Sequence, residues 1–262
     1  MSRKPKVLVT GASTGIGAVY AERFAHRGHD LVLVARNTER LDTLAARLRN
    51  ETGVAVDVVP ADLTDGQDLA KVEQRLREDR SIGVLVNNAG TSIPRGFLQQ
   101  QNEDISKLIA LNITAVTRLA HAAAPGFAER GEGAIINIAS VVGLAPEMGA
   151  TVYGATKAFV LFLSQGLNVE LADRGVYVQA VLPAATRTEI WDHAGVDVDT
   201  LAGVMEVGDL VDAALVGYDR RELVTIPPLP DADQWNALDA ARLAMLPNFS
   251  QSLPAERYRS AA

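Results

Sequence analysis

The chain has 262 residues, of which 48% are hydrophobic and 22% charged, a composition that is typical of a folded globular protein and excludes bulk disorder. Its formal net charge of −7 argues against binding to nucleic acid or to acidic membrane surfaces, and the absence of cysteine excludes disulfides, thiolate metal sites and cysteine nucleophiles. The four histidines are scattered, no apolar run is long enough to span a bilayer and no signal peptide is evident, so we expect a cytoplasmic protein without a bound metal.

Seven short apolar runs, rich in β-branched residues, alternate with amphipathic helical patterns over residues 1–228. Continuous apolar runs of this kind are typical of parallel strands that are buried on both faces. The alternation predicts a single α/β domain of the Rossmann type, with a doubly wound, seven-stranded parallel sheet and helices on both faces. The strands are expected at residues 6–10, 31–35, 55–60, 83–87, 134–139, 177–182 and 223–226.

The first expected strand leads into a glycine-rich turn and then into a helical pattern. The glycines have the spacing G-x-x-x-G-x-G, one residue wider at the front than the common dinucleotide fingerprint. A strand, a glycine turn and a helix start together present backbone N–H groups and a helix dipole to a pyrophosphate. We therefore expect a dinucleotide cradle here, with an ordinary glycine turn as the alternative. The expected contacts are Gly11, Ser13, Thr14, Gly15, Ile16 and Gly17.

The second expected strand is followed by Arg36 and Asn37, with no carboxylate. NAD-specific sites tend to place an acidic residue near this point to accept hydrogen bonds from the ribose hydroxyls. A guanidinium instead can bind a 2′-phosphate through charge-assisted hydrogen bonds. Arg36 therefore favours NADP(H) over NAD, and a solvated loop arginine is the alternative.

Further motifs follow the glycine turn in chain order. Asp62 and Leu63 follow the third strand, Asn87-Asn88-Ala89-Gly90 follows the fourth, and Asn112 lies in a later helix. Ser140 ends the fifth strand, and Tyr153-x-x-x-Lys157 comes 13 residues later. Each motif alone is weak, but in this order and spacing they resemble, together with the glycine turn, the motifs of the short-chain dehydrogenases/reductases over about residues 5–226.

The resemblance implies an NADP(H)-dependent oxidoreductase (EC 1.1.1.-) that interconverts a ketone or aldehyde and an alcohol by hydride transfer. It implies Tyr153 as the acid/base, Ser140 as the group that stabilises the substrate oxygen, and Asn112 as the holder of a water for proton exchange. Lys157, four residues after Tyr153 on one helix face, would lower the phenol pKa from about 10 and bind the nicotinamide ribose. The alternatives are a backbone-paired asparagine, a solvated Y-x-x-x-K face, and a non-catalytic NADPH-binding regulatory protein.

The resemblance also implies further cofactor contacts. Asp62 and Leu63 would contact the adenine, with a simple turn role as the alternative for Asp62. For Asn87 a structural role is expected, and Pro183 and Thr188 would contact the nicotinamide side. Ala184 stands where the family usually has glycine, so we expect backbone without positive φ there. The remaining expected contacts are Asn88, Ala89, Gly90, Tyr153 and Lys157.

Two helices have a predicted buried face. Leu41, Leu44, Ala45 and Leu48 have the spacing i, i+3, i+4, i+7 in one of them. In the helix that starts near Thr151, the expected core-facing residues are Val152, Ala155, Phe159, Phe162 and Leu163.

The substrate and the assembly are less defined. Residues 91–97, 141–148 and 186–205 contain few charges, which favours an apolar or aromatic carbonyl substrate. The family resemblance implies a homodimer or homotetramer that pairs through the helices at residues 102–129 and 151–173. Residues 229–262 are expected to be a C-terminal extension, with a short helix within 232–246, that packs on the domain or on a neighbouring subunit.

Overall fold

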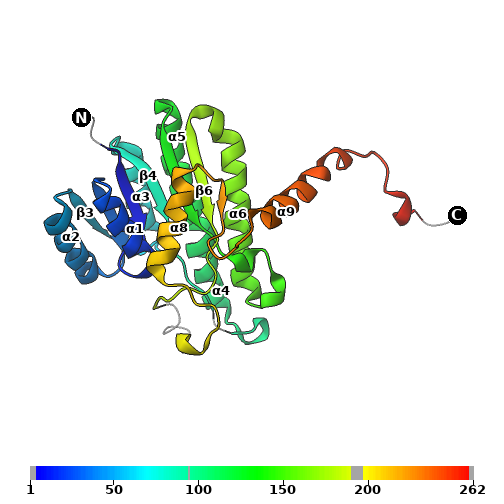
Figure 1. The fold of residues 1–262 in the computed structure, drawn as a ribbon, viewed down its shortest axis with the longest axis horizontal. Coiled ribbons are helices and arrows are strands. Elements are labelled where there is room, and N and C mark those ends of the chain that lie inside the picture. Colours follow the sequence, from blue (N-terminus) through cyan, green and yellow to red (C-terminus); the bar gives the residue numbers. More distant parts are fainter. Residues whose placement is uncertain (1–3, 94, 190–196, 260–262) are drawn as a thin grey trace. The chain divides into compact units, whose positions relative to one another are not determined.

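The computed structural model describes residues 4–93, 95–189 and 197–259, and the chain divides into two compact units, Met1–Pro228 and Leu229–Ala262. The first unit is built on a sheet of seven parallel strands in the order β3-β2-β1-β4-β5-β6-β7 (Figure 1). Each strand lies within one residue, at either end, of its predicted position, and the predicted Rossmann-type sheet is confirmed. The strands are β1 Lys6–Thr10, β2 Leu31–Ala35, β3 Val56–Pro60, β4 Ile82–Asn87, β5 Gly133–Ile138, β6 Val176–Val181 and β7 Val224–Thr225.

Helices cover both faces of the sheet, and each face has its own cluster of buried apolar side chains. Helices α1 (Gly15–His26), α2 (Thr38–Thr52) and α8 (Val207–Asp219) cover one face. Helices α3 (Gly66–Glu78), α5 (Val116–Arg130) and α6 (Thr151–Leu171) cover the other. A further helix, α4 (Asn102–Ile109), runs into α5 through the π-helix Ala110–Ala115.

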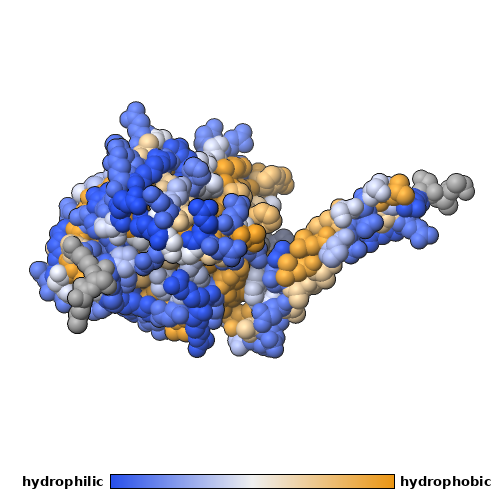
Figure 2. Space-filling view, turned by 90° about the horizontal axis from the view of Figure 1, so that it is seen from above, coloured by the Kyte–Doolittle hydropathy of each residue, from blue (hydrophilic) through white to orange (hydrophobic). Residues whose placement is uncertain are grey.

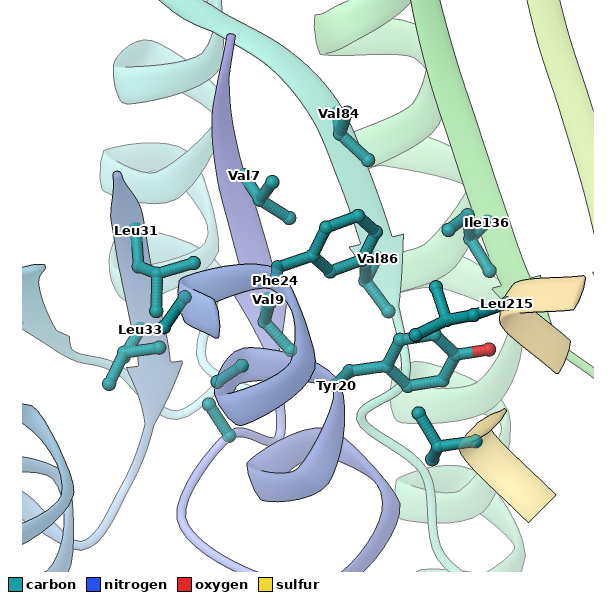
Figure 3. Packing of buried hydrophobic residues seen from close by; sticks show 14 of the residues in the cluster. Val7, Val9, Tyr20, Phe24, Leu31, Leu33, Val84, Val86, Ile136 and Leu215 are labelled. Atoms are coloured by element: carbon teal, nitrogen blue, oxygen red, sulfur yellow. The ribbon is translucent and has the colours of Figure 1, made fainter. Parts of the chain in front are cut away.

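Aromatic side chains of α1 fill the centre of the first cluster. Tyr20 and Phe24 are fully buried and lie over β1 and β4, next to Val9 and Val86 (Figure 3). Burial of side chains of this size contributes about 1.5–3 kcal/mol each to folding. The start of α1 is therefore fixed rigidly against the sheet, and with it the glycine turn.

The strand order places a crevice beside β1. From β1 the chain runs outward to β2 and β3 on one side, and it then returns to form β4 on the other side. Ligands of doubly wound sheets bind at this reversal, outside the carboxyl ends of the strands. The predicted site residues follow those carboxyl ends, so the topology gathers them at one edge of the sheet.

The prediction of buried helix faces succeeds for α2 and fails for α6. Leu41, Leu44, Ala45 and Leu48 are all buried. In α6, however, Ala155, Phe159 and Phe162 are exposed, with Phe162 at 76%, and Val152 and Leu163 are only partly buried. The buried side of α6 instead carries Gly154, Thr156, Lys157, Val160, Leu161 and Ser164. Polar side chains occupy this face because each finds hydrogen-bond partners inside the protein.

The second unit contains the helix α9 (Ala232–Ala244), which lies within the predicted range 232–246. None of its residues is buried, and apolar side chains are exposed along this segment (Figure 2), including Leu238, Met245 and Phe249. In the described parts of the chain, no helix combines the length and the apolar character needed to cross a membrane.

Candidate active site and cofactor cradle

The glycine turn is held against the end of β4 by Asn88. The Asn88 side-chain amide donates to the carbonyl oxygens of Thr10 (2.9 Å) and Gly11 (3.2 Å), and the Thr10 hydroxyl accepts from the backbone N–H groups of Asn88 and Ala89. A Cβ on Gly17 would lie 2.3 Å from the Gly11 oxygen, and Gly11 itself has φ +64°. These two glycines are therefore required by contacts within the protein, besides any approach of phosphates.

A cradle for an anion opens beside this turn. Helix α1 begins at Gly15, and the side chain of its N-cap residue Thr14 makes no capping hydrogen bond to the first N–H groups of the helix. A cavity of about 530 Å³ borders Ser13, Thr14 and Gly15 and extends to the start of α2. Backbone donors and a helix dipole that face such a cavity fit the pyrophosphate of a dinucleotide.

The far end of the cradle carries positive charge. Arg36 is exposed after β2, and its charge reaches Asp62, which follows β3. Burial tends to raise the pKa of Asp62, but hydrogen bonds from Thr64 and the charge of Arg36 hold it below its ordinary value. Asp62 also accepts from the Thr64 N–H and hydroxyl, which are the bonds of the turn role that was the alternative to an adenine contact. Leu63 beside it is buried.

Arg40 is a guanidinium that borders this cavity, and the sequence analysis missed it. Asn37 caps α2 by accepting from the Arg40 N–H (3.0 Å), and the Arg40 guanidinium donates to Glu189 at 2.7 Å. This ion pair connects the start of α2 with the loop after β6. The sequence signal that could have identified Arg40 was its position in the first turn of the helix that follows Arg36 and Asn37.

The loop after β6 reaches the same turn. Pro183 is buried, and its carbonyl oxygen accepts from the Val141 N–H (2.9 Å). Ala184 does not have positive φ, as expected for alanine at this place. The Thr188 side chain lies 3.2 Å from the place that a Cβ on Gly15 would occupy, so this residue contacts the glycine turn. Residues 190–196 of the expected substrate stretch lie outside the described residues.

Ser140, Tyr153 and Lys157 come together at the carboxyl end of β5. The turn after Ser140 packs closely on α6, because a Cβ on Gly143 would lie 2.7 Å from the Ala158 nitrogen. Ser140 is 7% exposed, and its hydroxyl donates to the Pro183 oxygen at 3.2 Å and accepts from the Val142 N–H at 3.3 Å. Lys157 is 5% exposed, and its Nζ donates to the Ile138 oxygen at 2.8 Å and lies 5.6 Å from the centre of the Tyr153 ring.

The electrostatics of this cluster differ in one respect from the sequence-based expectation. Burial raises the pKa of Tyr153, and hydrogen bonding with Ser140 opposes that rise only in part. Lys157 is not among the causes of this shift, so the expected lowering of the phenol pKa by Lys157 is not found in this structure. Burial also lowers the pKa of Lys157 to about 8, which leaves the ammonium mainly protonated at pH 7.

Asn112 lies in the π-helix between α4 and α5 and is 1% exposed. Its amide nitrogen donates to the Thr91 oxygen (2.9 Å) and to the Thr156 hydroxyl (3.1 Å), and its amide oxygen accepts from the Thr91 N–H (2.9 Å). The pairing to backbone that was the alternative for Asn112 is thus present. A Cβ on Gly90 would lie 3.3 Å from the Asn112 oxygen and 3.5 Å from the Lys157 Nζ. The Asn112 oxygen and the lysine therefore border one small space.

The neighbouring asparagine Asn87 has the structural role expected for it. Its buried side chain donates to the Asn137 oxygen at 3.0 Å, and Asn137 in turn donates to Ser164 on α6 at 2.9 Å. This line of hydrogen bonds crosses from β4 to β5 and on to α6. It ties α6 to the sheet.

Comparison with known proteins finds relatives among the dehydrogenases and reductases. A family model described as short chain dehydrogenase matches residues 5–198. The structure resembles the short-chain dehydrogenase from Sphingobium yanoikuyae in complex with NADPH, at 67% identity and TM-score 0.96, over 97% of this chain and 100% of that one. It also resembles the bulky-bulky ketone specific alcohol dehydrogenase from Comamonas testosteroni, at 60% identity and TM-score 0.92, over 98% and 99% of the two chains.

A curated relative is more distant. The very-long-chain 3-oxoacyl-CoA reductase of Anas platyrhynchos is 38% identical over 187 residues, which are 70% of this chain. The match covers 60% of that relative's length, so the chain spans well under two thirds of it.

Proposed function

The chain belongs to the short-chain dehydrogenase/reductase family, and on that premise we propose that it is an NADP(H)-dependent oxidoreductase that interconverts a ketone or aldehyde and an alcohol. The observation that carries the proposal is the convergence of the buried Ser140 and Lys157 with the partly buried Tyr153 at the carboxyl edge of the sheet. The Sphingobium relative was solved with NADPH and the Comamonas relative acts on ketones, which supports both the cofactor and the reaction class.

The residues at the cradle fit a bound NADPH. The glycine turn would hold the pyrophosphate, Asp62 and Leu63 the adenine, and Arg36 the 2′-phosphate. When bound, the nicotinamide supplies the hydride that a carbonyl carbon accepts, or takes it from an alcohol. The remaining proposed contacts are Asn88, Ala89, Gly90, Tyr153, Lys157, Pro183 and Thr188.

The side chains around the reacting oxygen would handle its proton. Tyr153 donates its phenolic proton to the carbonyl oxygen during reduction and takes it back during oxidation. Ser140 turns its hydroxyl from the Pro183 carbonyl to the substrate oxygen and stabilises the charge that develops there. The Lys157 ammonium lies beside the Tyr153 ring and stabilises the phenolate that remains.

The proposed substrate is a ketone or aldehyde with bulky apolar groups. Leu144 (37% exposed) and Met148 (61% exposed) belong to the stretch that follows Ser140, where the substrate is expected. The ketone specificity stated for the Comamonas relative supports the same class. A long-chain acyl thioester, suggested by the Anas relative, is the second candidate, and it rests on a shorter match.

The outer face of α6 supports a homodimer or homotetramer. Phe162 and Val169 are 76% and 82% exposed, and Figure 2 shows hydrophobic side chains gathered at the edge of the first unit where α6 lies. Exposed apolar patches of this kind mark interaction surfaces. We further propose that residues 229–262 pack on the domain or on a neighbouring subunit, because α9 buries none of its own residues. A cytoplasmic location remains a prediction from the sequence.

The test of the proposed activity is a panel of aryl and alkyl ketones and aldehydes assayed with NADPH and, in parallel, with NADH. We expect NADPH oxidation with bulky ketones, and transfer of deuterium from 4-deuterated NADPH to the carbinol carbon of the product. Tight NADPH binding without turnover on any member of the panel would instead favour the non-catalytic regulatory protein.

A further inference from the structure

A carboxylate, Glu189, borders the cavity at the start of α1. Ser13, Thr14 and Gly15 border the same cavity, where the first N–H groups and the dipole of the helix favour an anion. A negative side chain at such a place repels the phosphate groups of a dinucleotide unless a cation compensates its charge. The ion pair that Glu189 forms therefore decides how much negative charge the cavity presents.

The cation that compensates Glu189 is Arg40, in the first turn of α2. Its Nη1 donates to the Glu189 Oε2 at 2.7 Å, and the two side chains are 49% and 45% exposed. Asn37 accepts from the Arg40 N–H at 3.0 Å, which fixes the backbone of Arg40 and leaves its guanidinium on a flexible stem. Arg47, which also borders the cavity, pairs with Glu22 at 2.7 Å. Both of these arginines are thus paired with carboxylates of the protein.

The neighbour of Glu189 in the chain places this carboxylate at the cavity. The Thr188 side chain lies 3.2 Å from the place that a Cβ on Gly15 would occupy, so the segment contacts the glycine turn. The ion pair between Glu189 and Arg40 joins the segment to α2, which borders the cavity on its other side. A 2′-phosphate in this cavity would form a charge-assisted hydrogen bond with the same guanidinium. Glu189 and the phosphate are therefore competitors for Arg40.

We propose that Glu189 is a specificity-determining residue for the cofactor, which lowers the affinity for NADP(H) by holding Arg40 in the cofactor-free protein. The inference rests on the proposed function, in which Arg36, four residues before Arg40, binds the 2′-phosphate. NADP(H) exchanges the carboxylate on Arg40 for its phosphate, whereas NAD(H) has no 2′-phosphate and leaves the ion pair intact. Affinity is reduced by the fraction of molecules in which Arg40 is paired, and an exposed pair favours that state by no more than about fivefold.

The experiment titrates the full-length protein with adenosine 2′,5′-bisphosphate and adenosine 5′-monophosphate, which differ only in the 2′-phosphate, and measures Kd by calorimetry. Glu189→Gln should lower the Kd for the bisphosphate by about three- to fivefold and leave that for the monophosphate within about twofold. Glu39→Gln is the matched control, because it removes another carboxylate that borders the cavity, and it should change neither Kd by more than about twofold. Equal gains in the two variants, or an equal gain for both nucleotides, would overturn the proposal.

A double-mutant cycle with Arg40→Gln separates competition for Arg40 from plain repulsion between Glu189 and the phosphate. If Glu189 holds Arg40, Arg40→Gln raises the Kd for the bisphosphate more in the Glu189→Gln background than in the wild type. If Glu189 only repels, Arg40→Gln uncovers its charge and has an equal or larger effect in the wild type, which would overturn the proposal. NADPH-dependent turnover together with an unchanged Kd in Glu189→Gln would refute this inference alone. A wild type that neither binds NADPH nor reduces a ketone would refute the proposed function itself.

Discussion

The two ends of the cofactor cleft are built in opposite ways. At the end proposed for the adenosine, Arg36 is exposed, and the ion pair between Arg40 and Glu189 has side chains that are 49% and 45% exposed. At the end proposed for catalysis, Asn112, Ser140 and Lys157 are each less than 10% exposed, and each is hydrogen-bonded within the protein. Exposed pairs contribute only about 0–1 kcal/mol, whereas burial of a charge costs several times more. Residues at the exposed end should therefore affect the preference between NADPH and NADH with little effect on stability. The buried charge at the other end should lower the stability of the fold while it supports the reaction.

Among the variants that test the contrast between the exposed end and the buried end, Lys157→Met should have the largest effect. The variant should lose at least about a thousandfold in kcat, because the ammonium beside Tyr153 is gone. It should also be more stable at pH 7 by about 1–2 kcal/mol, because methionine carries no buried charge. Steady-state kinetics and chemical denaturation of the same preparation measure both changes. A variant that is inactive and also less stable would mean that Lys157 contributes to folding as well.

The pH dependence of the stability difference between the wild type and Lys157→Met tests whether the buried charge causes that difference. The pKa of Lys157 is about 8 in the folded protein and close to 10.5 in the unfolded chain, so the unfolded state binds more protons between these values. The wild type should therefore gain stability relative to Lys157→Met as pH rises from about 8 to about 10.5. A difference that does not change over this window would exclude the buried charge as its cause.

Arg36→Asp tests the exposed end. A carboxylate repels the 2′-phosphate and can accept from ribose hydroxyls, so the preference for NADPH over NADH should fall by about 10- to 100-fold. Arg36→Gln is the matched control, because it removes the attraction without adding repulsion, and it should show an intermediate loss. The kcat/KM ratios for the two cofactors measure the change. An unaltered ratio in both variants would show that Arg36 does not contact the phosphate.

Arg40→Gln should have the smallest effect. Its guanidinium already pairs with Glu189, and exposed ion pairs of this kind are weak, so the KM for NADPH should rise about threefold or less. Arg47, which borders the same cavity and pairs with Glu22, provides the control Arg47→Gln. If Arg40→Gln changed cofactor preference more than Arg36→Asp, the phosphate-binding arginine would be Arg40.

The sequence predicted most of the fold, because parallel strands buried on both faces leave continuous apolar runs. It failed on α6, where the count of apolar residues placed Phe159 and Phe162 in the core. That helix buries Thr156, Lys157 and Ser164 instead, and only the tertiary hydrogen bonds reveal why. Polar residues at a buried face give the same sequence signal as a solvated face.

The site shows a similar division. The motif spacing placed Ser140, Tyr153 and Lys157 in the right elements, because their chemistry is local to one strand end and one helix. The spacing could not predict that the Asn112 amide donates to Thr156, since that contact joins residues 44 positions apart. The spacing also could not predict that Gly11 and Gly17 pack against the side chain of Asn88, which follows β4. This contact exists because β1 and β4 are neighbours in the sheet.

The most direct test of the central claim is Tyr153→Phe, measured for turnover and for NADPH binding in one preparation. The phenylalanine variant keeps the ring and removes only the hydroxyl that would transfer the proton. We predict a loss of at least about a thousandfold in kcat with a bulky ketone, and a Kd for NADPH within about threefold of the wild type. Turnover close to that of the wild type would contradict the assignment of Tyr153 as the acid/base, and with it the account of the buried end of the cleft.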